Sequence, residues 1–143
     1  MDFFAAVKKR HSYREEFAST PVSDEHIRQI MEAALMAPSG LNMQTTSFIV
    51  VKNAEVRAKI AEILPTAATK TAPVIVVAMS KKVVAHGMCF EVEDYSAAVE
   101  NILLAAVALG YSAVWMDGMT KADKLNEKIA ELLNVPAGQT VRT

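Results

Sequence analysis

The chain has 143 residues, of which 52% are hydrophobic, and its formal net charge is −1. This length suits one domain with a sizeable core, so we expect a single domain over residues 1–143. A charge near zero argues against wholesale binding of nucleic acid, which requires many cationic contacts to phosphate. The longest apolar run, Ile102–Leu109, is too short to cross a bilayer, so no membrane association is expected.

The cysteine and histidine content points away from metal and thiol chemistry. Cys89 is the single cysteine, so the chain can form no internal disulfide, and a reduced cytoplasmic setting is expected. We interpret Cys89 as a packing residue rather than a nucleophile. The three histidines, His11, His26 and His86, lack the spacing of metal ligands.

The N-terminal half is predicted to form three helices and one strand. Each helix begins after a capping residue, and these residues are Asp2, Ser23 and Asn53. The three helices are expected to end near Arg10, at Pro38 and at Pro65. Between the second and third helices, Phe48–Val51 reads as a buried strand.

The C-terminal half carries the most apolar elements. Val74–Met79 is apolar on both alternating faces, which predicts a central strand covered on both sides. Val92–Leu109 is the longest predicted helix and has almost no polar face. It is therefore expected to be buried, either inside the domain or in a subunit interface. Gly110 is a suitable residue to end it, and Tyr111–Met116 is predicted to be a third strand.

A last helix and a short strand are expected at the end of the chain. Thr120 and Asp123 resemble a capping box at the start of this helix. The helix is predicted to end at Asn134–Pro136. Val141–Thr143 has the composition of a strand.

Two arginines and a serine alternate within Arg10–Arg14, directly after the first predicted helix. In extended backbone, residues two apart point the same way, so Arg10, Ser12 and Arg14 are expected to share one side. Two guanidinium groups and a hydroxyl suit a phosphate monoester. The alternative is a solvated basic loop.

Two further segments carry candidate ligand-binding groups. Small and amide-bearing residues lie between the second helix and the first strand: Pro38, Ser39, Gly40, Asn42 and Gln44. These residue types also favour ordinary turns, which is the alternative interpretation. Trp115–Gly118 stands at the C-terminal end of the third predicted strand, where α/β proteins tend to place ligands. Trp115 itself is either a ligand contact or a core residue.

The order of these segments resembles that of the nitroreductase family of flavin enzymes. The likeness continues through Ala72–Val77, Asp94–Ala106, Leu109–Tyr111, Trp115–Gly118 and Leu133–Gly138, so it spans nearly the whole chain. It implies an α+β fold, in which helices flank a mixed, largely antiparallel central sheet in three α/β/α layers. It also implies an intertwined homodimer with two FMN sites at the subunit interface.

The resemblance implies which residues bind FMN. The phosphate, ribityl chain and pyrimidine edge would be bound by Arg10, His11, Ser12 and Arg14. The isoalloxazine ring would be lined from the partner subunit by Pro38, Ser39, Gly40 and Asn42, with Gln44 close by. Along the ring, near its reactive nitrogen, would lie Met116, Asp117 and Gly118.

The implied activity is that of an FMN-dependent oxidoreductase that uses NAD(P)H to reduce nitroaromatics, quinones or similar small electron-poor acceptors by a ping-pong mechanism. The flavin carries this chemistry, so no catalytic side chain is expected. No G-x-G-x-x-G motif follows a strand, so the nicotinamide is expected to stack on the flavin. One alternative is a non-catalytic flavin-binding or scaffold homodimer, and another is a flavoprotein specialised for dehalogenation or flavin fragmentation.

Three departures from the family pattern bear on these expectations. His11 stands where the family most often has a second arginine, and because histidine titrates near neutrality, flavin affinity is expected to fall as pH rises. Residues 65–71 and 80–93 are short compared with the excursions of larger members, which predicts either an open and less selective pocket or one closed by few residues. Family members usually continue past the position of Thr143 into a basic tail, and its absence motivates the scaffold alternative.

Overall fold

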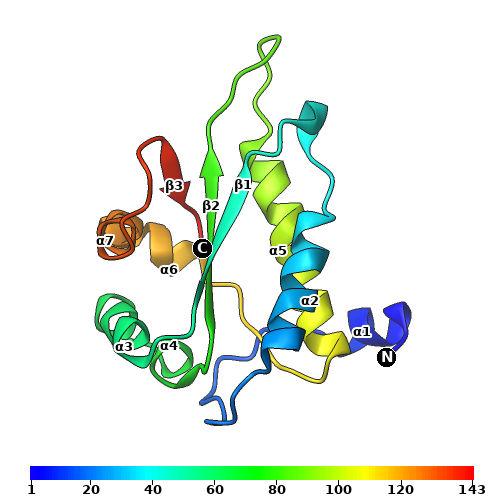
Figure 1. Cartoon of the computed structure of the whole chain (residues 1–143), viewed down its shortest axis with the longest axis vertical. Helices are drawn as coiled ribbons and strands as arrows, with labels where there is room; N and C mark the ends of the chain where they lie inside the picture. The colour runs from blue at the N-terminus through cyan, green and yellow to red at the C-terminus, as the bar shows by residue number, and fades with distance from the viewer.

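Helices cover both faces of a small central sheet in the computed structural model, which describes residues 1–143 (Figure 1). The sheet contains β1 (Thr46–Val51), β2 (Ile75–Lys81) and β3 (Gln139–Val141) in the order β1-β2-β3, and both pairings are antiparallel. The only parallel pairing is an isolated bridge between Ser12 and Ala113. The α+β class and the layered arrangement agree with the sequence-based expectation.

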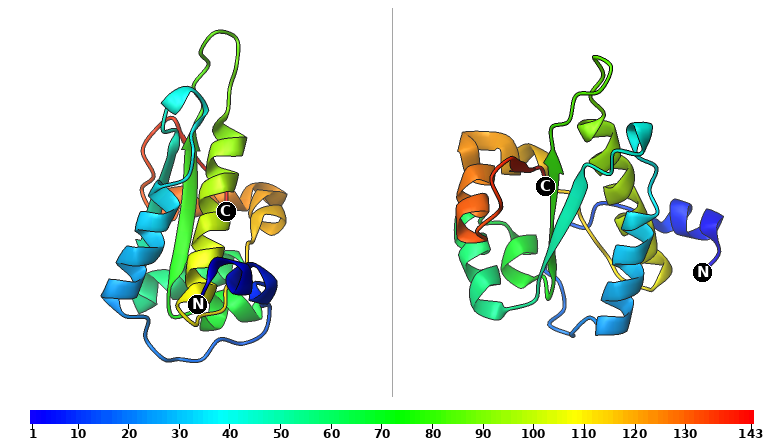
Figure 2. Two further views of the ribbon diagram at one scale, coloured as in Figure 1. Left: turned by 90° about the vertical axis from the view of Figure 1, so that its right-hand side faces the viewer. Right: turned by 45° about the horizontal axis from the view of Figure 1, so that its top comes forward.

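The helices fall into two groups on either side of the sheet. They are α1 (Phe3–Lys9), α2 (Asp24–Leu35), α3 (Ala54–Ile63), α4 (Ala67–Thr71), α5 (Glu91–Ala108), α6 (Asp117–Lys121) and α7 (Leu125–Leu132). Two short 3-10 helices, η1 (Gly40–Asn42) and η2 (Ala122–Lys124), complete the set. In Figures 1 and 2, α2 and α5 lie on one side of the sheet, while α3, α4 and α7 lie on the other. No helix combines the length and apolarity needed to span a membrane.

The three predicted helix caps on the N-terminal half are confirmed. The side chain of Asp2 accepts a hydrogen bond from the Ala5 amide at 3.0 Å. Ser23 and Asn53 accept equivalent bonds at the starts of α2 and α3, at 3.2 and 3.0 Å. Each oxygen satisfies an amide that has no partner within its own helix, which is why these residues fix the helix starts.

β2 is covered on both faces, as its doubly apolar sequence predicts. Val77 and Met79 join a buried cluster with Ile60 of α3 and Ile129 of α7. Ala78, between them, faces the opposite layer with Tyr95 and Val99 of α5. Alternate residues of one strand therefore contribute to two cores.

The long apolar helix α5 is buried largely inside the chain itself. It packs against α2 and the sheet, and its buried residues are Asp94, Tyr95, Ala98, Val99, Leu103, Ala106 and Val107. Gly110 follows it with a φ of +90°, which confirms the expected glycine at its end. The first of the two interpretations, burial within the domain, therefore accounts for one face of this helix.

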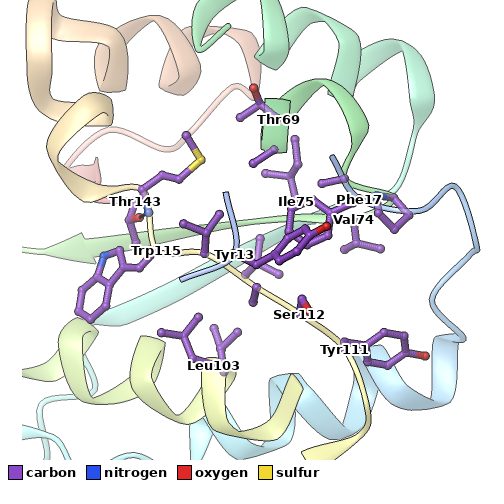
Figure 3. A pocket seen from close by; sticks show the side chains of 18 of the residues that line it. Tyr13, Phe17, Thr69, Val74, Ile75, Leu103, Tyr111, Ser112, Trp115 and Thr143 are labelled. Carbon is purple, nitrogen blue, oxygen red and sulfur yellow. Dashed lines mark hydrogen bonds between the residues drawn. The ribbon is translucent and has the colours of Figure 1, made fainter. Parts of the chain in front are cut away.

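The prediction of a third strand over Tyr111–Met116 is wrong. This segment makes a single bridge, between Ala113 and Ser12, and no backbone hydrogen bond joins it to β2. An apolar cavity of about 490 Å³ separates the two, lined by Val74–Ala78 on one side and Tyr111–Met116 on the other (Figure 3). Thr143 lies at the cavity, where its carbonyl accepts from the Ala78 amide and its hydroxyl accepts from the Met116 amide.

The predicted start of the last helix is also wrong. Residues 117–124 form α6 and η2, and the Thr120 hydroxyl donates to the Met116 carbonyl inside α6 instead of capping α7. The residue before α7 is Lys124, which is left-handed (φ 58°) and makes no capping bond. The short helix α4 was not predicted, although Thr66 and Thr69 form a capping box at its start. β3 ends at Val141, where the sequence suggested a strand start.

Candidate functional site

The segment after α1 is extended and is held to residues 111–116. Ser12 bridges Ala113, and the Tyr13 amide donates to the Ala113 carbonyl at 3.1 Å. The predicted arginine segment is therefore not a free loop. Its side chains nevertheless have weak and exposed contacts, because the nearest polar partner of Arg14 is the Ser12 carbonyl at 3.5 Å.

Arg10 and His11 face neighbouring protein groups. Arg10 Nε lies 3.6 Å from Glu100 Oε1 of α5, in a pair that remains substantially solvent-exposed. His11 is exposed, and its Nδ1 lies 3.1 Å from the Lys9 carbonyl, so that nitrogen carries the proton in this contact. The expectation that Arg10, Ser12 and Arg14 act as one phosphate site stays a prediction.

A second cavity, of about 260 Å³, brings two of the three predicted segments together. It is lined by Arg14 and by Met116, Asp117 and Gly118, with Thr66, Ala68, Val114, Trp115 and Met119 around them. A Cβ built on Gly118 would meet nothing within 4 Å, so its surface toward the cavity is open. A guanidinium group and a stretch of open backbone thus share one wall of the same cavity.

The side chain of Asp117 points into the protein rather than serving as an available ligand group. Tyr95 Oη donates to Asp117 Oδ2 at 3.1 Å, and Lys121 Nζ lies 2.5 Å from Oδ1. The hydrogen bond to Asp117 raises the pKa of Lys121 above its ordinary value. Because the carboxylate is already paired, it is not a free anion at the cavity.

Trp115 has features of both proposed roles. Its ring packs edge-on against Tyr95 with the centroids 6.4 Å apart, and it borders the core cluster of Ala78 and Val99. It also lines both cavities. Its indole N–H is buried and has no hydrogen-bond partner. Core packing thus explains most of this side chain, while the N–H is left for a ligand or a water to satisfy.

The loop of residues 38–45 is fixed by a buried carboxylate. Asp94 of α5 accepts hydrogen bonds from the Ser39 hydroxyl (3.0 Å), the Gly40 amide (2.7 Å) and the Thr45 hydroxyl (2.7 Å). Gly40 has no room for a side chain, because an added Cβ would overlap the Phe90 ring. The loop is therefore a rigid turn seated on α5, and the amide side chains of Asn42 and Gln44 are exposed on it.

The loop and the arginine segment lie apart within one chain. η1 lies beside the N-terminal end of α5 and α1 beside its C-terminal end (Figures 1 and 2). The cavity that Arg14 lines contains none of residues 38–44. One chain therefore joins Arg14 to Met116–Gly118 but does not bring Pro38, Ser39, Gly40, Asn42 and Gln44 to the same cavity.

Several large apolar side chains are exposed near these segments. Phe3 and Phe4 of α1 are 63% and 73% exposed, and Leu35 and Met36 at the end of α2 are 67% and 81% exposed. Leu41 in η1 is 54% exposed. Exposed apolar groups of this size mark surfaces that contact other molecules.

Sequence reasoning missed three residues that organise these sites: Asp94, Tyr95 and Lys121. The sequence signal was weak, because Asp94 is one of three acidic residues in the first turn of α5, where carboxylates are favoured in any helix. The partners themselves are 49 to 55 residues away in the sequence for Asp94, so no local pattern indicates them.

Comparisons with known proteins agree with this architecture. The model of the Nitroreductase family matches residues 7–70 and 64–142. A relative from Methanothermobacter thermautotrophicus, named "Putative NADH dehydrogenase/NAD(P)H nitroreductase", is 37% identical over 137 residues, which cover 95% of this chain and 71% of the relative. A relative of the same name from Archaeoglobus fulgidus is 37% identical over 126 residues, covering 84% of this chain and 70% of the relative.

Solved structures show the same fold. A nitroreductase family protein from Clostridium novyi NT has a TM-score of 0.87 at 26% identity, over 99% of this chain and 81% of that one. An FMN-dependent nitroreductase from Clostridium difficile R20291 has a TM-score of 0.82 at 28% identity, over 97% of this chain and 82% of that one. The family model covers almost every residue and the fold agrees with it, so this chain belongs to the nitroreductase family.

Proposed function

We propose that this chain is an FMN-dependent oxidoreductase that uses NAD(P)H to reduce small electron-poor acceptors such as nitroaromatics and quinones in a ping-pong sequence. Its family supports the oxidoreductase class, and a solved neighbour is described as FMN-dependent. The observation that carries the proposal is the cavity where Arg14 meets Met116–Gly118.

The groups around this cavity fit a phosphorylated planar cofactor. Arg14 is exposed and has one long contact, so its guanidinium is available to a phosphate, with which it can form a bidentate pair. Gly118 leaves space for close approach of a ring to the backbone. The residues that would hold FMN are thus Arg10, His11, Ser12 and Arg14 around the phosphate and ribityl chain, and Met116, Asp117 and Gly118 along the ring.

When bound, FMN supplies the redox chemistry, and the protein supplies binding, orientation and electrostatics. Asp117 orients the 116–118 backbone through its bonds to Tyr95 and Lys121. Lys121 stays protonated across the physiological range and places a fixed positive charge next to this backbone. Val114, Trp115 and Met119 supply apolar lining to the cavity.

We further propose a homodimer in which the 38–45 loop of one protomer completes the site of the other. The separation of the loop from the Arg14 cavity within one chain supports this arrangement. The exposed apolar side chains of α1, α2 and η1 supply surface for it, since obligate dimer interfaces are more apolar than ordinary protein surface. The lone cysteine fits a reducing cytoplasmic setting.

An anaerobic absorbance spectrum tests the proposed function. The protein, purified or reconstituted with FMN, is expected to be yellow, to be bleached by NADH or NADPH, and to regain its colour when nitrobenzoate or benzoquinone is added. Light scattering is expected to give twice the mass of one chain. A protein that binds FMN but is not bleached, or one that takes up no FMN at all, refutes the oxidoreductase and favours the non-catalytic homodimer.

A further inference from the structure

Asp94 is a buried carboxylate whose only partners belong to the 38–45 loop. Asp94 is 5% exposed, and it takes part in none of the chain's seven ion pairs. A buried charge without a cation requires several good hydrogen bonds. Asp94 accepts three, of which two are 2.7 Å long.

Three residues of the loop adopt an unusual backbone conformation. Leu41, Asn42 and Gln44 all have positive φ, at 51°, 55° and 50°. Left-handed backbone is well tolerated by asparagine but unfavourable for most other residues with a Cβ, so Leu41 and Gln44 need support from their surroundings. Asp94 holds the loop from both ends, because Ser39 and Gly40 precede these residues and Thr45 follows them.

Two further contacts complete this anchor. The backbone amide of Gln44 donates to the Ser39 hydroxyl at 2.7 Å, so Ser39 connects the far side of the loop to Asp94. Phe90 and Asp94 are four residues apart and so share one face at the start of α5. The Phe90 ring packs against Gly40, and the Asp94 carboxylate accepts a hydrogen bond from the Gly40 backbone amide.

We infer that Asp94 is a positioning residue that sets the shape of the 38–45 loop before FMN binds and so controls flavin affinity across the subunit boundary. This inference rests on the proposed function. Asp94 itself does not touch the cofactor. It holds Asn42 and Gln44 in place, which lowers the ordering cost of binding.

The test compares Asp94→Ala, Asp94→Asn and the double variant Asp94→Ala with Ser39→Ala against wild type in two measurements. The first is the FMN dissociation constant, from quenching of flavin fluorescence on titration into FMN-free protein. The second is amide hydrogen exchange over residues 38–45 in the FMN-free protein. The control is Asn101→Ala, which removes a tertiary hydrogen bond from the same helix to the Ala33 carbonyl, away from the loop.

Asp94→Ala is expected to weaken FMN binding by about 10- to 100-fold and to accelerate exchange throughout the loop. Asp94→Asn is expected to recover part of both, because an asparagine oxygen still accepts from the Gly40 amide. The double variant is expected to bind FMN only slightly more weakly than Asp94→Ala alone, since Ser39 and Asp94 act as one unit. Asn101→Ala is expected to lower the unfolding temperature while leaving the FMN dissociation constant unchanged.

The inference is overturned if Asp94→Ala binds FMN as wild type does, or if Asn101→Ala loses FMN to the same extent as Asp94→Ala. Failure of the proposed function gives a different result, because wild type itself then binds no FMN. In that case the exchange measurement decides alone. Unchanged exchange over residues 38–45 in Asp94→Ala would refute the positioning role.

Discussion

The two segments predicted to hold the cofactor are anchored in opposite ways. Residues 10–14 are pinned through their backbone to residues 111–116, and their charged side chains make long, exposed contacts. Residues 38–45 are held through side chains, by a buried carboxylate at hydrogen-bond distances of 2.7 to 3.0 Å. The first arrangement leaves cations available to a ligand, and the second fixes a shape. We therefore expect changes in the first to affect binding and changes in the second to affect folding as well.

The largest expected effect comes from Arg14→Ala. Removing a charged hydrogen bond to the FMN phosphate is expected to weaken FMN binding by about 1.5–3 kcal/mol. The unfolding free energy should stay within about 0.5 kcal/mol of wild type, because the side chain is exposed. Lys9→Ala is the matched control, since Lys9 is an exposed cation on the same segment that lines neither cavity. Equal FMN affinity in Arg14→Ala and wild type would remove Arg14 from the site.

Gly40→Ala tests the other side of the comparison. The added methyl overlaps the Phe90 ring, so the loop or the ring must move, at a cost of about 1–3 kcal/mol in unfolding free energy. Chemical denaturation measures this loss. Gly118→Ala is the control for stability, because its methyl enters open space. Similar unfolding free energies for the two variants would mean that the loop can shift at little cost and is not rigid.

A smaller effect is expected from Lys121, which supports residues 116–118 through Asp117. Its pKa is raised in the folded protein, chiefly by the hydrogen bond to Asp117. A raised pKa means that the stabilisation is complete below the ordinary lysine value of about 10.4 and is lost as pH rises through the higher folded-state value. Above about pH 10.4, the unfolding temperature of wild type should therefore decrease more steeply with pH than that of Lys121→Met. Parallel curves would show that this ion pair adds no stability.

Cys89→Ser should have the smallest effect. Cys89 is a free cysteine that makes no hydrogen bond and lines neither cavity, although it directly precedes Phe90. Turnover of NAD(P)H with a quinone acceptor is expected to match that of wild type. A variant without turnover would show either that the change disturbs the contact of the neighbouring Phe90 with Gly40, or that the thiol takes part in the reaction.

The helix starts that the sequence predicted correctly depend on neighbours within a few residues. Asp2, Ser23 and Asn53 cap helices because each accepts from an amide three residues ahead. A strand instead requires a partner from elsewhere, which is why the apolar stretch Tyr111–Met116 was misread. It has the composition of a strand, but a cavity lies where its partner along β2 would be.

The candidate site shows the same contrast between features set by local sequence and features set by distant contacts. Residue types and their order along the chain indicated the Arg14 and Met116–Gly118 segments, and these do share a cavity. Their role in FMN binding remains a prediction. The supporting residue Asp94 escaped notice because its three donors come from a distant part of the sequence. Likewise, only the fold reveals that Asp117 turns its carboxylate toward Tyr95.

The cavity between β2 and residues 111–116 has a mechanical consequence. About 490 Å³ of space lies there, lined mostly by apolar side chains and partly open to solvent, so the two segments are not packed against each other. Unfolding eliminates such voids and reduces the volume of the system, so hydrostatic pressure favours the unfolded chain. Because residues of α3, α5 and α7 all line this cavity, a change in its volume under pressure should be felt on both sides of the sheet.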